Sequence, residues 1–431
     1  MTAEVGVMNT MGVALAADSA VTVRGKAEKI HISAEKLFQL SDSAPVGAML
    51  YGNAFFVGLP WETIVKSYRR HLGDTLFETV REYAEHLLSW IGENRDLFPD
   101  EVRERQIFSL LLSYFLFIRD EIKERINREA ERQDGLNESD LPAILDQVVK
   151  ESLERVRSSP LLKTLPTDSH KLLRKEFRSA LARIKTQVFG QLPFKPSTKR
   201  LLNTLAVELL ARHYFGPFQC GLVVAGYGEK QYMPALVSYE VEEMVCSKPR
   251  CVMINDYVIE GPAEAVIIPF GQKDVVRAFM EGIDERVHGF MVESTSEVFK
   301  GALEFLIGTV KRADERLGDT LSTAIDPNVE SMLSELFDAW QNYRRDYWGP
   351  VLNVMSSLPK DGLAEIAEAL VNLTKFRRQV TDVPETVGGP VDVAVITKGD
   401  GFVWMRRKHY FEASLNPRFI ARYYKRRNGY D

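Results

Sequence analysis

The sequence predicts an α+β fold in which antiparallel sheets are covered by helices and interrupted by two helical insertions. Short apolar runs with strand spacing occur near both ends and in the middle of the chain. Long segments of helical period separate these runs. The composition fits a globular chain, since 45% of the 431 residues are hydrophobic and 27% are charged.

The first fifty-odd residues have the pattern of adjacent short strands. Apolar runs at 5–7 and 13–15 flank the turn-prone sequence Asn9-Thr10-Met11-Gly12. Two more strands are expected at 37–40 and 46–50, and the short connections favour antiparallel pairing. From Pro60 the period becomes helical, with Trp61, Ile64 and Tyr68 on one face.

Helical sequence continues to about His213, with breaks at Asp134-Gly135 and at 160–168. The apolar run 107–118 is expected to form a buried helix, because it is too short to span a bilayer. Strands return at 220–225 and 235–241, and a helix is expected at 273–287.

Residues 290–358 are again largely helical, and Asp361 is expected to cap a further amphipathic helix. The last strands, 391–397 and 402–406, flank a hairpin turn at 398–401. This order predicts a core of three pieces, 1–94, 214–287 and 359–431, the last with a basic tail. Helical insertions at 95–213 and 288–358 separate the pieces.

Charge and cysteine content exclude several classes of function. A formal net charge of -5 gives no general attraction to nucleic acid or to anionic membranes. The three cysteines, Cys220, Cys246 and Cys251, form no disulfide framework and fit a reducing compartment. No metal set, cofactor motif or secretory signal is recognisable, so the sequence predicts a cytoplasmic protein without a cofactor.

Thr2 carries the chemistry of greatest interest. A side chain this small favours removal of Met1, which exposes a free α-amine on Thr2. That amine titrates near neutrality and can serve as the base for the hydroxyl of the same residue. One residue then supplies both the nucleophile and its general base.

The sequence around Thr2 resembles the opening of proteasome β subunits and their simpler bacterial relatives. The segments Thr2-Ala3-Glu4-Val5-Gly6-Val7 and 12–18, with Thr22 following, match this pattern without gaps. Later matches are Gly52-Asn53-Ala54, the apolar strand 222–227, and Gly388-Gly389 with 391–398. The resemblance implies the four-layer αββα sandwich of N-terminal-nucleophile (Ntn) hydrolases, with Thr2 as nucleophile.

The resemblance also implies roles for other residues. Lys36 would lie beside the Thr2 hydroxyl and stabilise the alkoxide, and Asp18 would hold Lys36 charged and in place. The backbone N–H of Met49 would be the oxyanion donor, although the family has glycine at that position. Asp382 and Thr386 are candidates for polar groups near the terminal amine. For the substrate, the resemblance assigns an edge strand beside Thr22 and a roomy side-chain pocket at Gly47.

Three functions remain open at this stage. The leading one is a threonine peptidase that acts through an acyl-enzyme on a peptide or protein substrate. The others are a non-catalytic scaffold of the same fold and an Ntn amidase for small amides. The resemblance further implies a homo-oligomer, with an ATPase or another regulator as a possible partner. The 288–358 insertion is expected to obstruct ordinary stacking of two rings.

Overall fold

A computed structural model of the chain describes residues 2–23, 29–31, 34–132, 137, 139–190, 192–381, 387–409, 411–418 and 420–421. The chain forms two compact units. Unit 1 comprises Met1–Ala34, Ile259–Val395 and Trp404–Asp431, and unit 2 comprises Glu35–Val258 and Ile396–Val403. Within its described residues, no helix is both long enough and apolar enough to cross a membrane.

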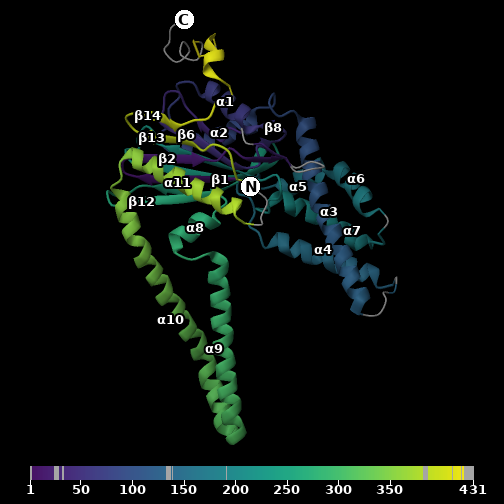
Figure 1. Cartoon of the computed structure of the whole chain (residues 1–431). Coiled ribbons are helices and arrows are strands. Elements are labelled where there is room, and N and C mark those ends of the chain that lie inside the picture. Colours follow the sequence, from purple (N-terminus) through teal and green to yellow (C-terminus); the bar gives the residue numbers. More distant parts are fainter. Residues whose placement is uncertain are drawn as a thin grey trace. The chain divides into compact units, whose positions relative to one another are not determined.

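Unit 1 is built on a sheet with strand order β12-β1-β2-β13-β14 (Figure 1). Its strands are β1 (Ala3–Asn9), β2 (Gly12–Ala17), β12 (Ala265–Gly271), β13 (Asp392–Thr397) and β14 (Gly401–Arg406), and the tip of the β13–β14 hairpin belongs to unit 2. β1 pairs antiparallel with both β12 and β2 and is buried along its whole length. A short ribbon, β3 (Val21–Val23) and β4 (Lys29–His31), follows β2.

Helix α11 (Lys360–Gln379) covers one face of this sheet. Leu363, Ala367 and Leu370 of α11 pack in one apolar cluster with Val5 and Val7 of β1. Alternate residues of a strand point to the same face, so Val5 and Val7 both reach the helix. This packing fixes the position of the strand that Thr2 begins.

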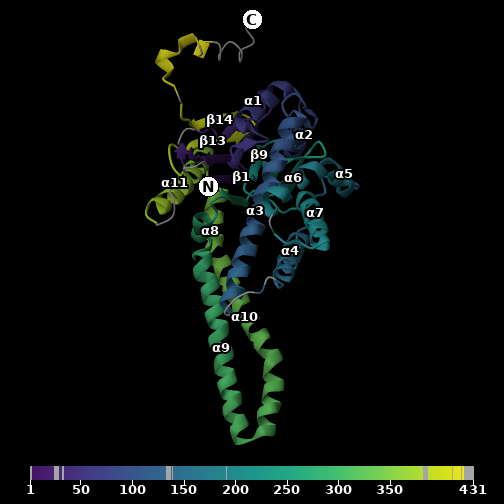
Figure 2. The ribbon, with the colours of Figure 1, turned by 90° about the vertical axis from the view of Figure 1, so that its right-hand side faces the viewer.

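The remaining helices of unit 1 are α8 (Asp274–Glu281), α9 (Glu285–Ala313) and α10 (Glu315–Ser356). A 3-10 turn, Ala413–Leu415, follows the sheet near the carboxyl end. α9 and α10 form a long antiparallel hairpin that extends away from the sheet of unit 1 (Figure 2). Asp314 makes the turn between them, and its side chain caps α10 by accepting a hydrogen bond from Leu317 N–H at 3.1 Å.

Unit 2 contains a second antiparallel sheet, with strand order β11-β10-β9-β6-β5. Its strands are β5 (Leu37–Gln39), β6 (Val46–Gly52), β9 (Cys220–Gly226), β10 (Ala235–Val245) and β11 (Lys248–Val258), and β7 (Phe55–Phe56) with β8 (Leu59–Pro60) forms a separate ribbon. Helices α1 (Trp61–Leu72) and α2 (Val80–Glu93) pack against one face of the sheet. Trp61, Tyr68 and Tyr83 are among the largest side chains of that core.

Five further helices of unit 2 form a second apolar core. They are α3 (Asp100–Arg132), α4 (Leu141–Arg157), α5 (Ser169–Glu176), α6 (Arg178–Phe189) and α7 (Pro196–Ala211). The fully buried Arg250 of β11 joins these helices to the sheet. Its guanidinium donates to the carbonyl oxygens of Leu209 and Leu210 and pairs with the Glu242 carboxylate.

The structure confirms the mixed α/β class with antiparallel sheets and every strand expected from the sequence. Two strands of the five-stranded sheets were missed, β11 and β12, and so were the strands of the two short ribbons, β3, β4, β7 and β8. The single helix expected at 273–287 is wrong, because Gly282 adopts a left-handed conformation that separates α8 from α9. The cap expected at Asp361 is also wrong, since Pro359 is the N-cap and Asp361 lies in the first turn. The break expected at Asp134-Gly135 lies outside the described residues.

Candidate functional site

Thr2 lies at the start of β1 and is only 2% exposed. Its carbonyl oxygen accepts a hydrogen bond of 2.8 Å from the N–H of Gln272, which follows β12. The next residue, Ala3, accepts a 3.1 Å hydrogen bond from Asp18 N–H. The peptide groups on the carboxyl side of Thr2 are therefore held from both neighbouring strands.

The Asp18 carboxylate is fully buried and accepts hydrogen bonds from three backbone N–H groups. Its Oδ1 accepts from Ala3 at 3.2 Å, and its Oδ2 accepts from Ala20 at 3.2 Å and from Gly388 at 2.9 Å. Hydrogen bonds from N–H groups to an ionised carboxylate are stronger than those to a neutral acceptor. Asp18 thus ties the start of β1, the end of β2 and the segment before β13 together.

Gly271 allows Thr2 and β12 to approach closely. An added Cβ at Gly271 would lie 2.1 Å from the Thr2 carbonyl oxygen, and the residue has a φ of +65°. Both the contact and the backbone conformation require glycine at this position. Gly271 is the last residue of β12 and lies between Phe270 and Gln272. The structure shows that the backbone of this segment contacts Thr2, through Gln272 N–H.

Ser19 is a residue of this site that the sequence analysis missed. Its N–H donates to the Gly388 carbonyl oxygen at 3.1 Å, and its hydroxyl donates to the Pro390 carbonyl oxygen at 2.5 Å. Together with Asp18 it holds residues 388–390 against the end of β2. Its position directly after the Ala-Ala-Asp segment was the available signal.

Lys36 and Met49 belong to unit 2, and the roles predicted for them beside Thr2 stay predictions. Lys36 is 5% exposed and directly precedes β5, and its carbonyl oxygen accepts from Leu50 N–H at 2.9 Å. Successive N–H groups of a strand point to opposite sides, so that of Met49 points toward Val223 of β9. An oxyanion role for Met49 requires its N–H to leave that ladder.

The space where a Cβ of Gly47 would stand is filled. A Cβ added to Gly47 would lie 2.7 Å from the Phe402 ring and 2.9 Å from the Ile396 side chain. The two apolar side chains of the β13–β14 hairpin fill the space that the missing side chain leaves. Gly47 therefore permits close packing here, and its role at a substrate pocket stays a prediction.

The other predicted site residues are described in part or not at all. Thr22 lies in β3 opposite Ile30, and its side chain is outside the described part of the structure. Asp382 and Thr386 also lie outside the described residues. Their proposed contacts with substrate and with the terminal amine stay predictions.

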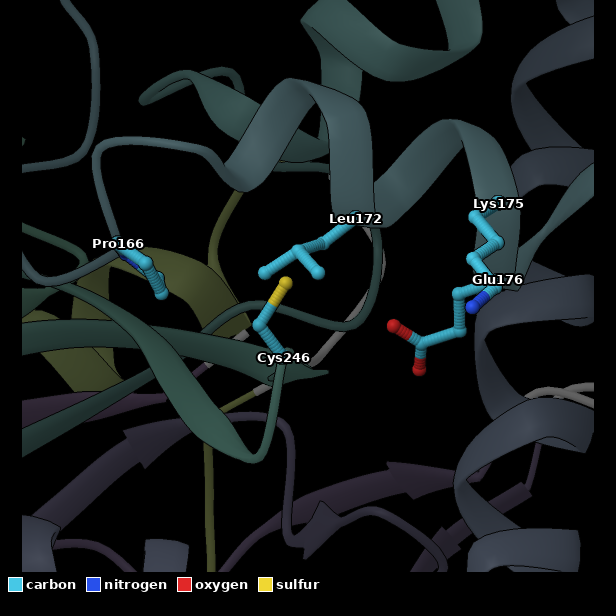
Figure 3. A pocket seen from close by; sticks show the side chains of 5 residues that line it. All are labelled: Pro166, Leu172, Lys175, Glu176 and Cys246. Carbon is cyan, nitrogen blue, oxygen red and sulfur yellow. The ribbon is translucent and has the colours of Figure 1, made fainter.

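A separate hollow of about 380 Å³ lies in unit 2 (Figure 3). It is lined by side chains from α5, from the loop before it and from the β10–β11 turn: Pro166, Leu172, Lys175, Glu176 and Cys246. Burial raises the pKa of the Cys246 thiol to about 11 and also raises that of the Glu176 carboxyl. A protonated thiol is a weak nucleophile, so Cys246 does not suit covalent catalysis at neutral pH.

Comparison with known proteins adds little to this geometry. No family model and no curated protein matches the sequence. Among solved structures, Anbu (ancestral beta-subunit) from Yersinia bercovieri is similar over 98% of this chain and 97% of that chain. The two chains share 10% sequence identity, with a TM-score of 0.29.

Proposed function

We propose that this chain is a threonine-type N-terminal-nucleophile hydrolase that cleaves amide bonds, with peptides as its substrate class. The observation that carries the proposal is the placement of Thr2 at the head of a buried inner strand. Hydrogen bonds from Gln272 and to Asp18 hold the peptide groups that follow it. A nucleophile held in this way loses little freedom when substrate binds.

The proposed reaction uses both functional groups of a processed Thr2. The hydroxyl oxygen attacks the substrate carbonyl carbon, and the α-amine accepts the hydroxyl proton. The tetrahedral intermediate collapses, and the leaving amine departs with that proton. The resulting ester on Thr2 is then hydrolysed by water, with the α-amine again acting as the base.

The roles of the other residues follow the sequence resemblance. Lys36 stabilises the alkoxide of Thr2, and Asp18 keeps Lys36 in place while it holds the first strand. The substrate is proposed to add as an extended strand beside Thr22. Asp382 and Thr386 are proposed to contact the terminal amine.

The same resemblance supports a proposal for the architecture. The core would be a four-layer αββα sandwich, and α3–α7 and α9–α10 would be insertions in it. The assembly would be a homo-oligomer, and the helical segment 95–213 offers a surface for a regulator such as an ATPase.

The test is the intact mass of the purified chain before and after exposure to a peptide epoxyketone. This reagent closes a ring with both the hydroxyl and the amine of an N-terminal threonine. We expect loss of Met1, one adduct on the wild-type chain and none on Thr2→Ala. Thr10→Ala removes a threonine hydroxyl from the β1–β2 turn and is the matched control, which should react like wild type. An adduct that persists in Thr2→Ala contradicts the proposal.

A second candidate function is a non-catalytic scaffold. Two observations favour it: the Met49 N–H points into the β6–β9 ladder, and Phe402 and Ile396 fill the space at Gly47. Retention of Met1 together with absence of any adduct would establish this alternative over the hydrolase. Adduct formation on Thr2 would exclude it.

A further inference from the structure

The α9–α10 hairpin of unit 1 exposes large apolar side chains along much of its length. The seam between the helices contains His288 and Trp340, whose ring centroids lie 5.0 Å apart, and Lys311 pairs with Asp319 near the turn. The exposed large apolar side chains of the hairpin include nine that lie away from this seam and are 42–72% exposed: Val287, Met291, Val298, Phe305, Met332, Leu336, Tyr343, Tyr347 and Val354. The hairpin therefore has apolar surface that its own two helices do not bury.

These nine side chains form one stripe on each helix. On α9, Met291, Val298 and Phe305 recur every seven residues, which is the spacing of a coiled-coil seam. On α10, Met332, Leu336, Tyr343, Tyr347 and Val354 follow a similar helical stripe. Successive residues of an α-helix are rotated by about 100° around the helix axis. On each helix, the exposed stripe therefore lies roughly a quarter-turn around the axis from the seam, in the direction of decreasing residue number. The rotation from seam to stripe has the same direction along the sequence on both helices. Because the helices are antiparallel, this places both stripes on the same side of the hairpin.

The area of this apolar face is large enough for a stable dimer. With the exposed fractions above, the nine side chains present on the order of 1,000 Å² of accessible surface. A specific protein interface buries about 800 Å² on each partner. Contiguous apolar patches of this size are uncommon on monomers and mark interaction sites.

The stripe on α9 has a shape that fits a second copy of itself. Ser294, Gly301 and Gly308 alternate with its bulky members, again seven residues apart. A Cβ added at Gly301 or Gly308 would meet nothing within 4 Å, so these positions are open holes on the surface.

Antiparallel packing of two α9 helices about a point between Phe299 and Lys300 fills these holes. In that register Met291 faces Gly308, Val298 faces Gly301 and Phe305 faces Ser294, and each pair occurs twice by symmetry. Alternation of large and small residues is what allows facing helices to interdigitate. We propose that the hairpin is a homodimerisation element, in which two copies of this chain join their apolar faces as an antiparallel four-helix bundle.

The first experiment measures the dissociation constant of the full chain by sedimentation equilibrium. Phe305→Glu and Val298→Glu place a carboxylate in the proposed interface, and each should raise the dissociation constant at least about 30-fold. Lys300→Glu adds a carboxylate to the same helix outside the stripe and should leave it unchanged. A wild-type chain that stays monomeric at about 100 μM, or equal effects of Phe305→Glu and Lys300→Glu, would overturn the proposal.

Gly301→Leu distinguishes specific packing in this register from non-specific hydrophobic association. The added Cβ meets nothing within 4 Å and leucine has a higher helix propensity than glycine, so the monomer should fold as well as wild type. In the proposed register it fills the hole that receives Val298, so association should weaken at least about 10-fold. Tighter association of Gly301→Leu would refute this register.

Spin labels test the antiparallel direction. In a Cys246→Ser background, where Cys220 and Cys251 are buried, labels are attached through Ala302→Cys or Lys311→Cys. Labels at 302 should lie within about 20 Å of each other, and labels at 311 about 35 Å apart along the bundle axis. Short distances at both positions would indicate parallel packing and contradict the proposal. This test is independent of whether Thr2 is a nucleophile.

Discussion

Replacing Asp18 by asparagine turns one carboxylate oxygen into an amino group and leaves the side-chain volume almost unchanged. The side-chain amide of asparagine can adopt two orientations. In one, its oxygen keeps the hydrogen bonds from Ala20 and Gly388, and its amino group points at the N–H of Ala3, so that two donors face each other. The other orientation keeps the bond from Ala3 and loses two. A buried donor without an acceptor costs about 1–3 kcal/mol, so Asp18→Asn should cost at least that much stability. Asp18→Ala removes both acceptor oxygens, and with them all three hydrogen bonds, and should cost about 3 kcal/mol or more.

Loss of the Ala3 bond also frees the peptide group that directly follows Thr2. A displacement of about 1 Å in a reacting group can slow a reaction roughly 100-fold. We therefore expect Asp18→Asn to slow epoxyketone adduct formation about 10- to 100-fold under conditions where the chain stays folded. Intact mass against time gives the rate, and urea denaturation gives the stability.

Asp392→Asn is the matched control for this prediction. Asp392 is buried, and its carboxylate accepts from both the N–H and the ammonium group of Lys408. The same substitution there should cost stability while leaving the hydrogen bonds that hold Thr2 and Ala3 in place. A wild-type adduct rate for Asp18→Asn would refute the reasoning. Equal slowing of adduct formation by Asp18→Asn and Asp392→Asn would also refute it, because the slower rate would then follow from lost stability alone.

Three further predictions concern packing and pH. Gly271 has a φ of +65°, and Gly271→Ala places a Cβ against the Thr2 carbonyl oxygen. We therefore expect a lower midpoint of urea denaturation and little epoxyketone adduct. A normal adduct rate would show that β12 does not position Thr2. Burial raises the pKa of Glu243 to about 8 from its ordinary 4.5, so the folded chain binds the extra proton between these values and stability falls as pH rises through that window. Glu243→Gln should therefore raise the melting temperature at pH 8 and change it little at pH 5, and an equal change at both would contradict the shift. Gly47→Ala forces a Cβ into Phe402 and should cost about 1–3 kcal/mol, part of which Phe402→Leu should restore in the double variant; additive losses in urea denaturation would argue against direct contact.

In the two five-stranded sheets, the sequence predicted the strands whose alternation is local and missed the two that contain proline. β12 has Pro269 in its interior, and β11 has Pro249 near its start. Proline removes a ladder donor and usually argues against a strand, so neither segment has a clear strand signature. Their place in a sheet depends on β1 and β10, which lie far away in sequence.

Helix ends were predicted less well than helix interiors. The 361–371 stripe correctly indicated α11, but the extended backbone of Pro359 moves its start one residue before Asp361. Asp361 still lies in the first turn, where a carboxylate is favourable to the helix dipole. Similarly, the left-handed Gly282 ends α8 inside a segment whose apolar spacing suggested one helix.

By itself the sequence determined the order of strands and helices and singled out Thr2 and Asp18, because periodicity and short motifs are local properties of the chain. Only the tertiary structure decided which residues hold them. Gly388 donates to Asp18 from 370 positions away, and Gln272 reaches Thr2 from the far side of β1. Each of these bonds has a backbone N–H as its donor, and every residue except proline carries that group. No residue type marks them in advance, and they exist only once β12 and the segment before β13 have packed beside β1 and β2.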